Sequence, residues 1–211
     1  MTILKVTPTR ITLLNLKKEL KVAQKGYKLL KDKRDGLMKK FMEIIRTTRQ
    51  LREAVEEQLG NAFSFYVKAT APIHPKTIEA AFLVPDITTT LTVDVKNIMS
   101  VPIPQFHIKK EGYAFSYGIL ETNGDLDNAI IKFDKVFCDM VKLAELEKTA
   151  ENLAKEIERT RRRVSALENT RIPNLEDTIH FITQQLEERA RDAIVSTMRV
   201  KAMIIAKENL F

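Results

Sequence analysis

The sequence contains few glycines and prolines, which interrupt helices, and almost no cysteine, which cross-links small domains through disulfides. Its 211 residues include 6 glycines, 7 prolines, 1 cysteine and no tryptophan. The single cysteine, Cys138, cannot form an internal disulfide, which excludes a disulfide-rich scaffold and fits a reducing cytosol. The sequence also lacks the pattern of a signal peptide, and it lacks any apolar run near the roughly 18 residues of a membrane span. We therefore expect a soluble chain that is rich in long helices.

The helix breakers that do occur lie mostly in the middle of the chain. No proline lies between Pro8 and Pro72, and after Gly124 there is no glycine and a single proline, Pro173. Two long uninterrupted segments therefore flank a broken middle. We predict three parts: an N-terminal long helix in 1–69, a middle region in 70–124 and a C-terminal long helix in 125–211.

Both flanking segments carry the residue spacing of a coiled coil. Seam positions, most of them apolar, alternate three and four residues apart in three runs: Leu13 to Val55, Leu143 to Leu167 and Leu175 to Ala193. At about 1.5 Å per residue, roughly 60 residues of the first segment reach about 90 Å and roughly 80 of the last about 120 Å. Because the middle region is short enough to turn the chain around, we predict a mainly α fold with a long antiparallel two-helix coiled coil. Seams in parallel homodimers are the alternative.

The spacing of the last segment is irregular near its centre. Between Leu167 and Leu175 it becomes four plus four through Arg171, a stutter that locally relaxes the supercoil. Pro173 removes the helical hydrogen bond to the carbonyl of Asn169. We therefore expect a bend at this point of the helix.

The middle region changes from helical spacing to strand-like alternation. After a short helix in 77–83, the stretch DITTTLTVDV is rich in threonine and valine and predicts a strand. The segments PQFHIKK and YAFSYGIL, joined by the turn EG, predict a small β-hairpin with Gly112 near its tip. Pro102 and Pro104 restrict their segment to an edge or a bulge. The turn NGD at 123–125 restarts the helix.

The residue patterns of common enzymes are absent from the sequence. None of the 6 glycines lies in a phosphate-binding loop, and His74, His107 and His180 lack the spacing of metal ligands. Cys138 follows the apolar Phe137 and has no histidine near it in sequence, which favours a packed thiol over a nucleophile. We expect no catalytic, cofactor-binding or metal-binding site, and therefore no enzyme.

Two basic clusters carry the strongest functional signal. The net charge of +7 and the pI of 9.4 favour an acidic partner. KLLKDKRD begins at Lys28 and ERTRRRV begins at Glu158. If the two helices turn near Phe65 and Asp127, both clusters lie at nearly the same level of the coiled coil. Together they would form a basic belt that consists of Lys28, Lys31, Lys33, Arg34, Arg161, Arg162 and Arg163. A solvated helix face is the alternative interpretation.

Several stretches resemble the D subunit of rotary V-type and A-type ATPases, the central rotor shaft. The matching stretches are TPTR at 7–10, AQKGYKLLKDKRD at 23–35, KNIMSVPIP at 96–104 and EIERTRRRVSALEN at 156–169, followed by IPNLEDTIHFITQQLEERAR. The likeness covers almost the whole chain in order. The C-terminal stretch DAIVSTMRVKAMIIAKENLF departs from it, because it is more apolar than the charged tail typical of this family.

The resemblance implies a non-catalytic shaft, cytoplasmic and peripheral on the membrane as part of the complex. It would transmit torque between a hexamer of A and B subunits, where ATP is hydrolysed or made, and the membrane ring that translocates ions. The basic belt would face acidic loops of that hexamer. An F subunit would bind the side of the lower coiled coil, and a funnel-like subunit would join the stalk to the ring. We assign the F-like contact to an apolar patch, which is broader than a two-helix seam needs and consists of Phe133, Phe137, Met140 and Val141.

Two other functions also fit a basic coiled coil. A nucleic-acid-binding arm or scaffold would place aromatic residues among exposed basic residues, but Tyr27 and Phe41 fall on the predicted seam. A helix pair on a membrane surface would carry a Trp/Phe-rich face, whereas the lysines here are interleaved with acids. We therefore expect neither a nucleic-acid partner nor a direct membrane span. Co-purification with two large nucleotide-binding subunits separates the rotor from both alternatives.

Overall fold

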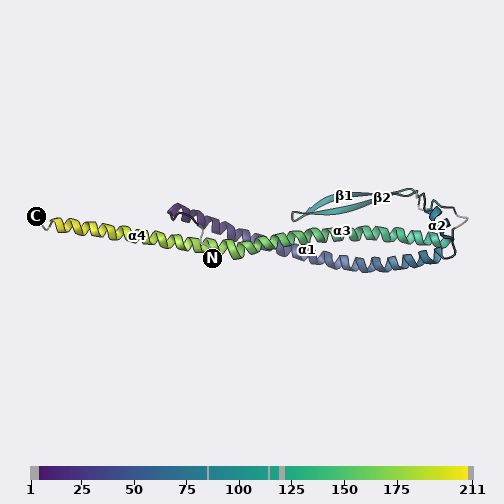
Figure 1. Cartoon of the computed structure of the whole chain (residues 1–211), viewed down its shortest axis with the longest axis horizontal. Coiled ribbons are helices and arrows are strands. Elements are labelled where there is room, and N and C mark those ends of the chain that lie inside the picture. Colours follow the sequence, from purple (N-terminus) through teal and green to yellow (C-terminus); the bar gives the residue numbers. More distant parts are fainter. Residues whose placement is uncertain (1–4, 85, 114, 119–121, 209–211) are drawn as a thin grey trace. The chain divides into compact units, whose positions relative to one another are not determined.

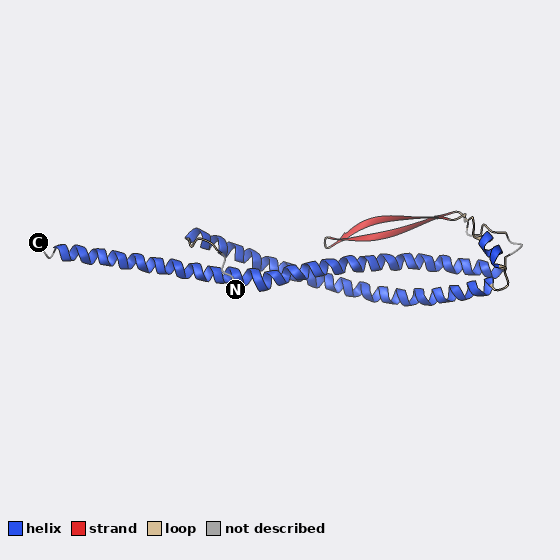
Figure 2. Cartoon of the chain, viewed as in Figure 1, coloured by secondary structure: helices blue, strands red, loops and turns tan. Residues whose placement is uncertain are grey.

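The fold is mainly α-helical, which confirms the predicted fold class. The computed structural model describes residues 5–84, 86–113, 115–118 and 122–208. Its elements are α1 Arg10–Thr70, α2 Pro75–Ala81, β1 Thr88–Ile98, β2 Val101–Glu111, α3 Gly124–Ala166, the π-helix η1 Leu167–Arg171 and α4 Ile172–Glu208 (Figure 1). Figure 2 shows the long helices and the small two-stranded sheet, which lies between α2 and α3 in the sequence. The predicted division of the sequence into three parts stays a prediction.

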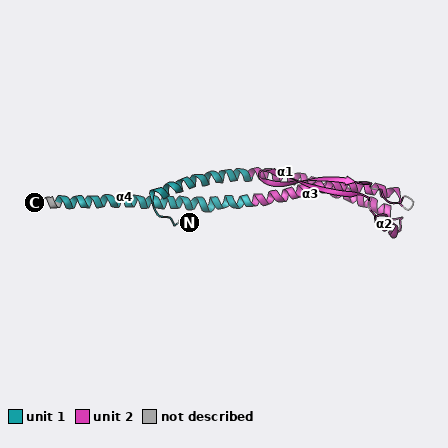
Figure 3. Ribbon diagram, turned by 90° about the horizontal axis from the view of Figure 1, so that it is seen from above, with its two compact units in different colours: residues 1–34, 159–211 teal, residues 35–158 magenta. Residues whose placement is uncertain are grey.

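The chain forms two compact units, which are coloured separately in Figure 3. One consists of residues 1–34 and 159–211, and the other of residues 35–158. Each unit contains one stretch of α1 and one stretch of the helical segment that follows the strands. Each therefore has its own part of the predicted two-helix coiled coil.

In the unit of residues 35–158, seam residues of α1 pack against seam residues of α3. Its buried clusters are Val55 and Ala62 with Val136, and Leu37 with Val101, Leu153 and Ile157. Val55 follows Leu37 on α1, whereas its partner Val136 precedes Leu153 on α3. Within this unit, α1 and α3 therefore run antiparallel. Leu37 and Leu153 are fully buried, and burial of each contributes about 1.5–3 kcal/mol to stability.

The short helix predicted at 77–83 is α2, which begins two residues earlier, at Pro75. Proline is favoured in the first helical turn because the N–H groups of that turn have no acceptor within the helix, so a residue without an N–H loses no helical hydrogen bond there. The ring nitrogen Nδ1 of His74 caps the helix by accepting a hydrogen bond from the N–H of Lys76 at 3.3 Å. This contact gives His74 a structural role.

The β-hairpin lies earlier in the sequence than we predicted. β1 pairs antiparallel with β2 from Ile98 opposite Val101 back to Thr88 opposite Glu111, and the turn is formed by Met99 and Ser100. Both turn residues have positive φ, 51° and 69°, although neither is glycine. The prediction missed this turn because it lacks the usual Asn-Gly or Asp-Gly signal.

The predicted tip at Gly112 is therefore wrong. Gly112 follows the end of β2 and has a φ of 103°, and a Cβ on it would overlap the backbone carbonyl of Asp86. Glycine is needed here for close backbone approach, not for the hairpin turn. The described residues of the predicted second strand, 113 and 115–118, are not in a strand, and the remaining ones lie outside the described residues.

Pro102 and Pro104 both lie in β2. In a two-stranded sheet each strand has one outer edge, so both prolines occupy an edge strand, as predicted. They lie opposite Asn97 and Val95, which belong to a strand without proline. The two outer edges of the hairpin therefore differ.

In the unit of residues 1–34 and 159–211, the start of α1 packs against α4. The cluster at its centre contains Leu16 with Leu175 and Ile182. α1 begins at Arg10 because Thr9 and Thr12 cap it reciprocally: the N–H of Thr9 donates to Thr12 Oγ1 at 3.0 Å, and the N–H of Thr12 donates to Thr9 Oγ1 at 3.2 Å. These contacts position the first turn of the helix.

The irregular spacing around Arg171 coincides with the π-helix η1. The N–H of Ile172 bonds to the carbonyl of Leu167, five residues back, as a π-helix requires. The looser turn accommodates the extra residue of the stutter just before Pro173, which has no N–H to donate. The predicted bend at this point stays a prediction.

Candidate partner-binding surfaces

The three arginines of the predicted basic belt point away from the helix seam. Thr160 and Val164 on either side of them are buried, with exposed fractions of 2% and 3%. Successive helical residues differ in direction by about 100°, so the residues between two seam positions fan outward. Arg161, Arg162 and Arg163 are accordingly exposed.

The structure brings the two halves of the basic belt to one level of the coiled coil. An ion pair joins Arg171 of η1 to Glu19 of α1 within the same unit. From this pair, α1 continues toward Lys28 while the opposite helix runs back toward Arg163. Because the helices are antiparallel, these two residues lie at similar heights.

The lysine half of the belt is less uniform than the arginine half. Lys28 and Lys31 are exposed, whereas Lys33 and Arg34 are half-buried. The ammonium group of Lys31 lies 5.9 Å from the centroid of the Tyr27 ring. Lys33, Arg34 and Arg162 interact with other groups of the chain. Part of the belt's charge is therefore already engaged within the protein.

The four residues of the predicted apolar patch divide into two kinds. Phe133 packs beside the buried cluster of Val55 and contacts Phe63 edge to face, with ring centroids 5.3 Å apart. Phe137 and Met140 are 42% and 45% exposed, while Val141 is half-buried. The accessible part of the patch is therefore centred on Phe137 and Met140.

Lys110 holds the end of β2 against α3 beside this patch. Its ammonium group forms an ion pair with Asp134, donates to Cys138 Sγ at 3.1 Å and lies 5.8 Å from the centroid of Phe137. Burial alone would lower the pKa of Lys110, but the hydrogen bonds to Asp134 and Cys138 outweigh it and raise the pKa. The lysine is therefore fully charged at neutral pH.

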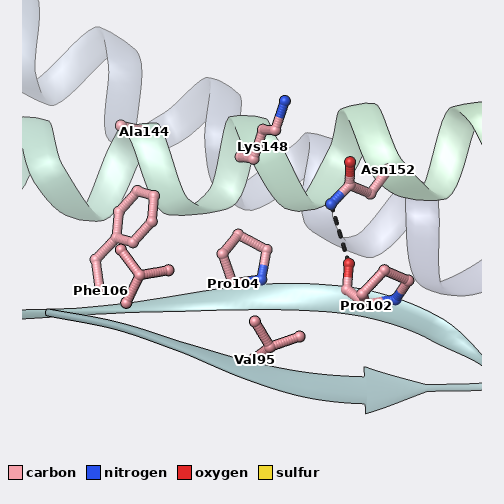
Figure 4. Close-up of a pocket in the computed structure, with 8 residues that line it drawn as sticks. Val95, Pro102, Pro104, Phe106, Ala144, Lys148 and Asn152 are labelled. Atoms are coloured by element: carbon pink, nitrogen blue, oxygen red, sulfur yellow. Dashed lines mark hydrogen bonds between the residues drawn. The ribbon is translucent and has the colours of Figure 1, made fainter.

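A mostly apolar groove lies between the hairpin and α3, as Figure 4 shows. Its walls include Val95, Pro104 and Phe106 from the strands and Ala144 from α3. The side-chain amide of Asn152 donates to the carbonyl of Pro102 at 3.0 Å across the groove (Figure 4). This hydrogen bond fixes β2 to α3.

Sequence reasoning missed this attachment of β2 to α3. Besides Asn152, α3 provides Glu145, whose Oε2 accepts a hydrogen bond from the N–H of Phe106 at 2.9 Å. Glu145 and Asn152 are one heptad apart and so lie on one stripe of the helix. The spacing was visible in the sequence, but nothing there indicated that a strand would lie beside that stripe.

The C-terminal part of α4 is a further surface that sequence reasoning did not assign to a site. From Arg189 to Ile205 every residue is exposed. Large apolar side chains occur along this stretch, with exposed fractions from 46% to 65%: Ile194, Val195, Met198, Val200, Met203, Ile204 and Ile205. Arg189 itself donates to the carbonyl of Pro8 at 3.0 Å, just before α1 begins. An apolar stretch of this length normally contacts another molecule.

The described residues contain no group of three or more His, Cys, Asp and Glu side chains that could hold a metal ion. Within the same residues, every helix is too short or too polar to cross a membrane.

The fold and its surfaces define an antiparallel coiled-coil protein with a β-hairpin attached to one of its long helices. The chain belongs to the family of ATP synthase D subunits, whose model matches residues 12–202. This confirms the resemblance that the sequence motifs indicate.

Curated relatives agree with this family over nearly their whole length. The chain is 43% identical over 204 residues to the V-type ATP synthase D subunit of Fusobacterium nucleatum, covering 95% of this chain and 97% of the relative. It is 43% identical over 215 residues to the protein of the same name from Acetivibrio thermocellus, covering 100% and 97%. The Streptococcus pyogenes protein of that name is 43% identical over 203 residues, covering 93% and 98%.

Proposed function

We propose that the chain is a non-catalytic central-stalk subunit of a V/A-type rotary ATPase. In this function it transmits torque between a hexamer of A and B subunits, which hydrolyses or makes ATP, and the membrane ring that translocates ions. It would be cytoplasmic and peripheral on the membrane as part of that complex. The observation that carries the proposal is the antiparallel coiled coil formed by residues that the family model matches.

A subunit that transmits torque must resist sliding and unwinding of its helices. Buried seam clusters supply the apolar part of this resistance in each unit. Ion pairs between helices add a directional part: Arg52 with Glu147 in one unit, and Glu19 with Arg171 in the other. The hydrogen bond from Arg52 to Glu147 raises the pKa of the arginine. Such exposed pairs contribute little stability each, but they oppose a shift of register.

The basic belt would act as the contact with acidic loops of the hexamer. A rotating contact must form and break at each step, so many weak and partly solvated ion pairs suit it better than deep apolar contacts. The exposure of Arg161, Arg162 and Arg163 fits this requirement. Contacts of this kind weaken as the salt concentration rises.

We propose two further partners, which the resemblance to the D-subunit family implies. An F subunit would bind the side of the coiled coil at Phe137 and Met140, the exposed members of the apolar patch. A funnel-like subunit would join the stalk to the membrane ring. The exposed apolar part of α4 would contact the hexamer, since it needs cover in the assembled complex.

Co-expression with the A and B subunits tests the function. We expect the chain to co-purify with both subunits and to change the ATP hydrolysis rate of the hexamer. The matched control is the A–B hexamer prepared without the chain. Failure of the chain to associate with the hexamer, in the presence or absence of the F subunit, would refute the proposed function.

A further inference from the structure

The hairpin has two outer edges, and only that of β2 is covered. Pro102 and Pro104 have no N–H to present at this edge. The N–H of Phe106 is bound by Glu145, and the carbonyl of Pro102 is bound by Asn152. The outer edge of β2 is therefore blocked from Pro102 to Phe106 by prolines and by side chains of α3.

The outer edge of β1 is open. In a hairpin with a two-residue turn, the residues that flank the turn hydrogen bond to each other, and the ladder bonds recur at every second pair. The N–H and C=O groups that face away from β2 therefore belong to alternate residues: Thr89, Leu91, Val93, Val95 and Asn97. Within the described part of the chain, no hydrogen bond to these backbone groups is found.

β1 also lacks the usual protection of an edge strand. Edge strands are commonly short, or they carry prolines, bulges or several charged residues that prevent pairing with another strand. β1 has 11 residues and no proline, and its charged residues are Asp94 and Lys96. Leu91, Val93 and Val95 are 49%, 52% and 66% exposed. An open edge of this length is a site for addition of another strand.

The sequence of β1 is complementary to itself in one antiparallel register. When two copies pair about a two-fold axis through Val95, Asp94 of each copy lies opposite Lys96 of the other. Val95 faces its own symmetry mate, and Val93 faces Asn97. A register centred on Asp94 would place two carboxylates opposite each other, and one centred on Val93 would form neither ion pair. Charge complementarity therefore selects the register centred on Val95.

We propose that β1 is a self-association site, through which the free chain pairs with a second copy of itself to form a four-stranded antiparallel sheet. The two β2 strands lie at the outer positions of this sheet, where their edges are blocked from Pro102 to Phe106, opposite Asn97 to Val93 of β1. This stretch surrounds the proposed two-fold axis at Val95, so the same mode of pairing cannot continue there and the association stops at the dimer. In the free chain the dimer protects the open edge from pairing with unrelated strands.

Sedimentation velocity on the isolated full chain tests this inference over a range of protein concentrations. We expect a reversible monomer–dimer equilibrium. Asp94→Lys should weaken the dimer at least about tenfold, because it replaces two ion pairs with two like-charge pairs. The double variant Asp94→Lys/Lys96→Asp should restore the dimer, since the opposite charges are exchanged. Val95→Pro should also abolish it, because that N–H faces outward and its loss leaves the β1–β2 ladder intact.

Circular dichroism should show the same helix content in all these variants, so that a change in association is not a change in folding. A wild-type chain that stays monomeric at high micromolar concentration would overturn the inference. So would a dimer that is equally stable in Asp94→Lys and Val95→Pro, because another surface, such as the apolar part of α4, would then hold the copies together. Failure of the charge exchange to restore the dimer would exclude the proposed register.

Discussion

Two kinds of position alternate within one short stretch of α3 and differ in their surroundings. Thr160 and Val164 occupy the buried seam, whereas the arginines between them are exposed. Seam residues hold the helices together, and outward residues are available to other molecules. Stability and partner binding should therefore separate cleanly when the two kinds of residue are changed independently.

Leu153→Ala should have the largest effect on stability. Leu153 is fully buried beside Leu37 and Ile157, and truncation of such a side chain costs about 2–5 kcal/mol. Urea unfolding followed by circular dichroism measures the loss. The exposed Arg159→Ala is the control and should change stability by less than about 0.5 kcal/mol. A loss below about 1 kcal/mol for Leu153→Ala would show that the seam does not carry the stability of the coiled coil.

Gly112→Ala extends the comparison to the segment after the hairpin, and it should lower stability by less than Leu153→Ala does. A side chain at a φ of 103° that also meets the carbonyl of Asp86 should cost about 1–3 kcal/mol. Gly60→Ala is a matched control within α1, where a Cβ has no neighbour within 4 Å. That control should stabilise the helix by about 0.5–1 kcal/mol. Thermal unfolding of the pair checks the sign of each change, and equal signs would contradict the described backbone at Gly112.

Glu145→Ala should loosen β2 from α3 without melting the helices. The N–H of Phe106 loses its acceptor, which should cost roughly 1 kcal/mol at this partly buried position. Hydrogen exchange measured by mass spectrometry should rise in β2 while α3 keeps its protection. The exposed Lys142→Ala on the same helix is the control. Faster exchange throughout α3 would show that Glu145 stabilises the helix itself.

Replacement of Arg161, Arg162 and Arg163 by glutamine should have the smallest effect on stability. All three side chains are exposed, and glutamine has good helix propensity, so the change should stay within about 0.5 kcal/mol. Thermal unfolding measures it. A large loss of stability would show that these arginines stabilise the coiled coil itself and do not serve only as a contact surface.

The sequence predicts the coiled coil better than it predicts the middle region. The heptad spacing identifies Leu16, Val55 and Ile182 as seam residues because burial of one helix face requires that periodicity. The hairpin turn was missed because Met99 and Ser100 adopt positive φ without the usual turn residues. Their conformation depends on tertiary contacts that local propensity does not contain, such as the packing of Val101 on Leu37 and Leu153.

Contact surfaces were predictable only in part. The arginines stood out because three adjacent charges on a heptad helix must include outward positions. By contrast, the division of the apolar patch depends on which side of α3 meets α1, since that packing covers Phe133 and leaves Phe137 exposed. The attachment of β2 through Glu145 and Asn152 joins residues distant in the sequence. Periodicity on one helix does not reveal such a pairing.

The most direct test of the torque-transmitting function is the ATP hydrolysis rate of the reconstituted A–B hexamer with the arginine-to-glutamine triple variant. The control variant replaces Lys17, Lys18 and Lys21 with glutamine, which removes the same charge from exposed positions of α1. We predict weaker assembly or less stimulation of hydrolysis for the arginine variant alone. The defect should grow with ionic strength, as the remaining ion pairs are screened. Equal assembly and hydrolysis for both variants at every salt concentration would contradict a role of the basic belt in torque transmission.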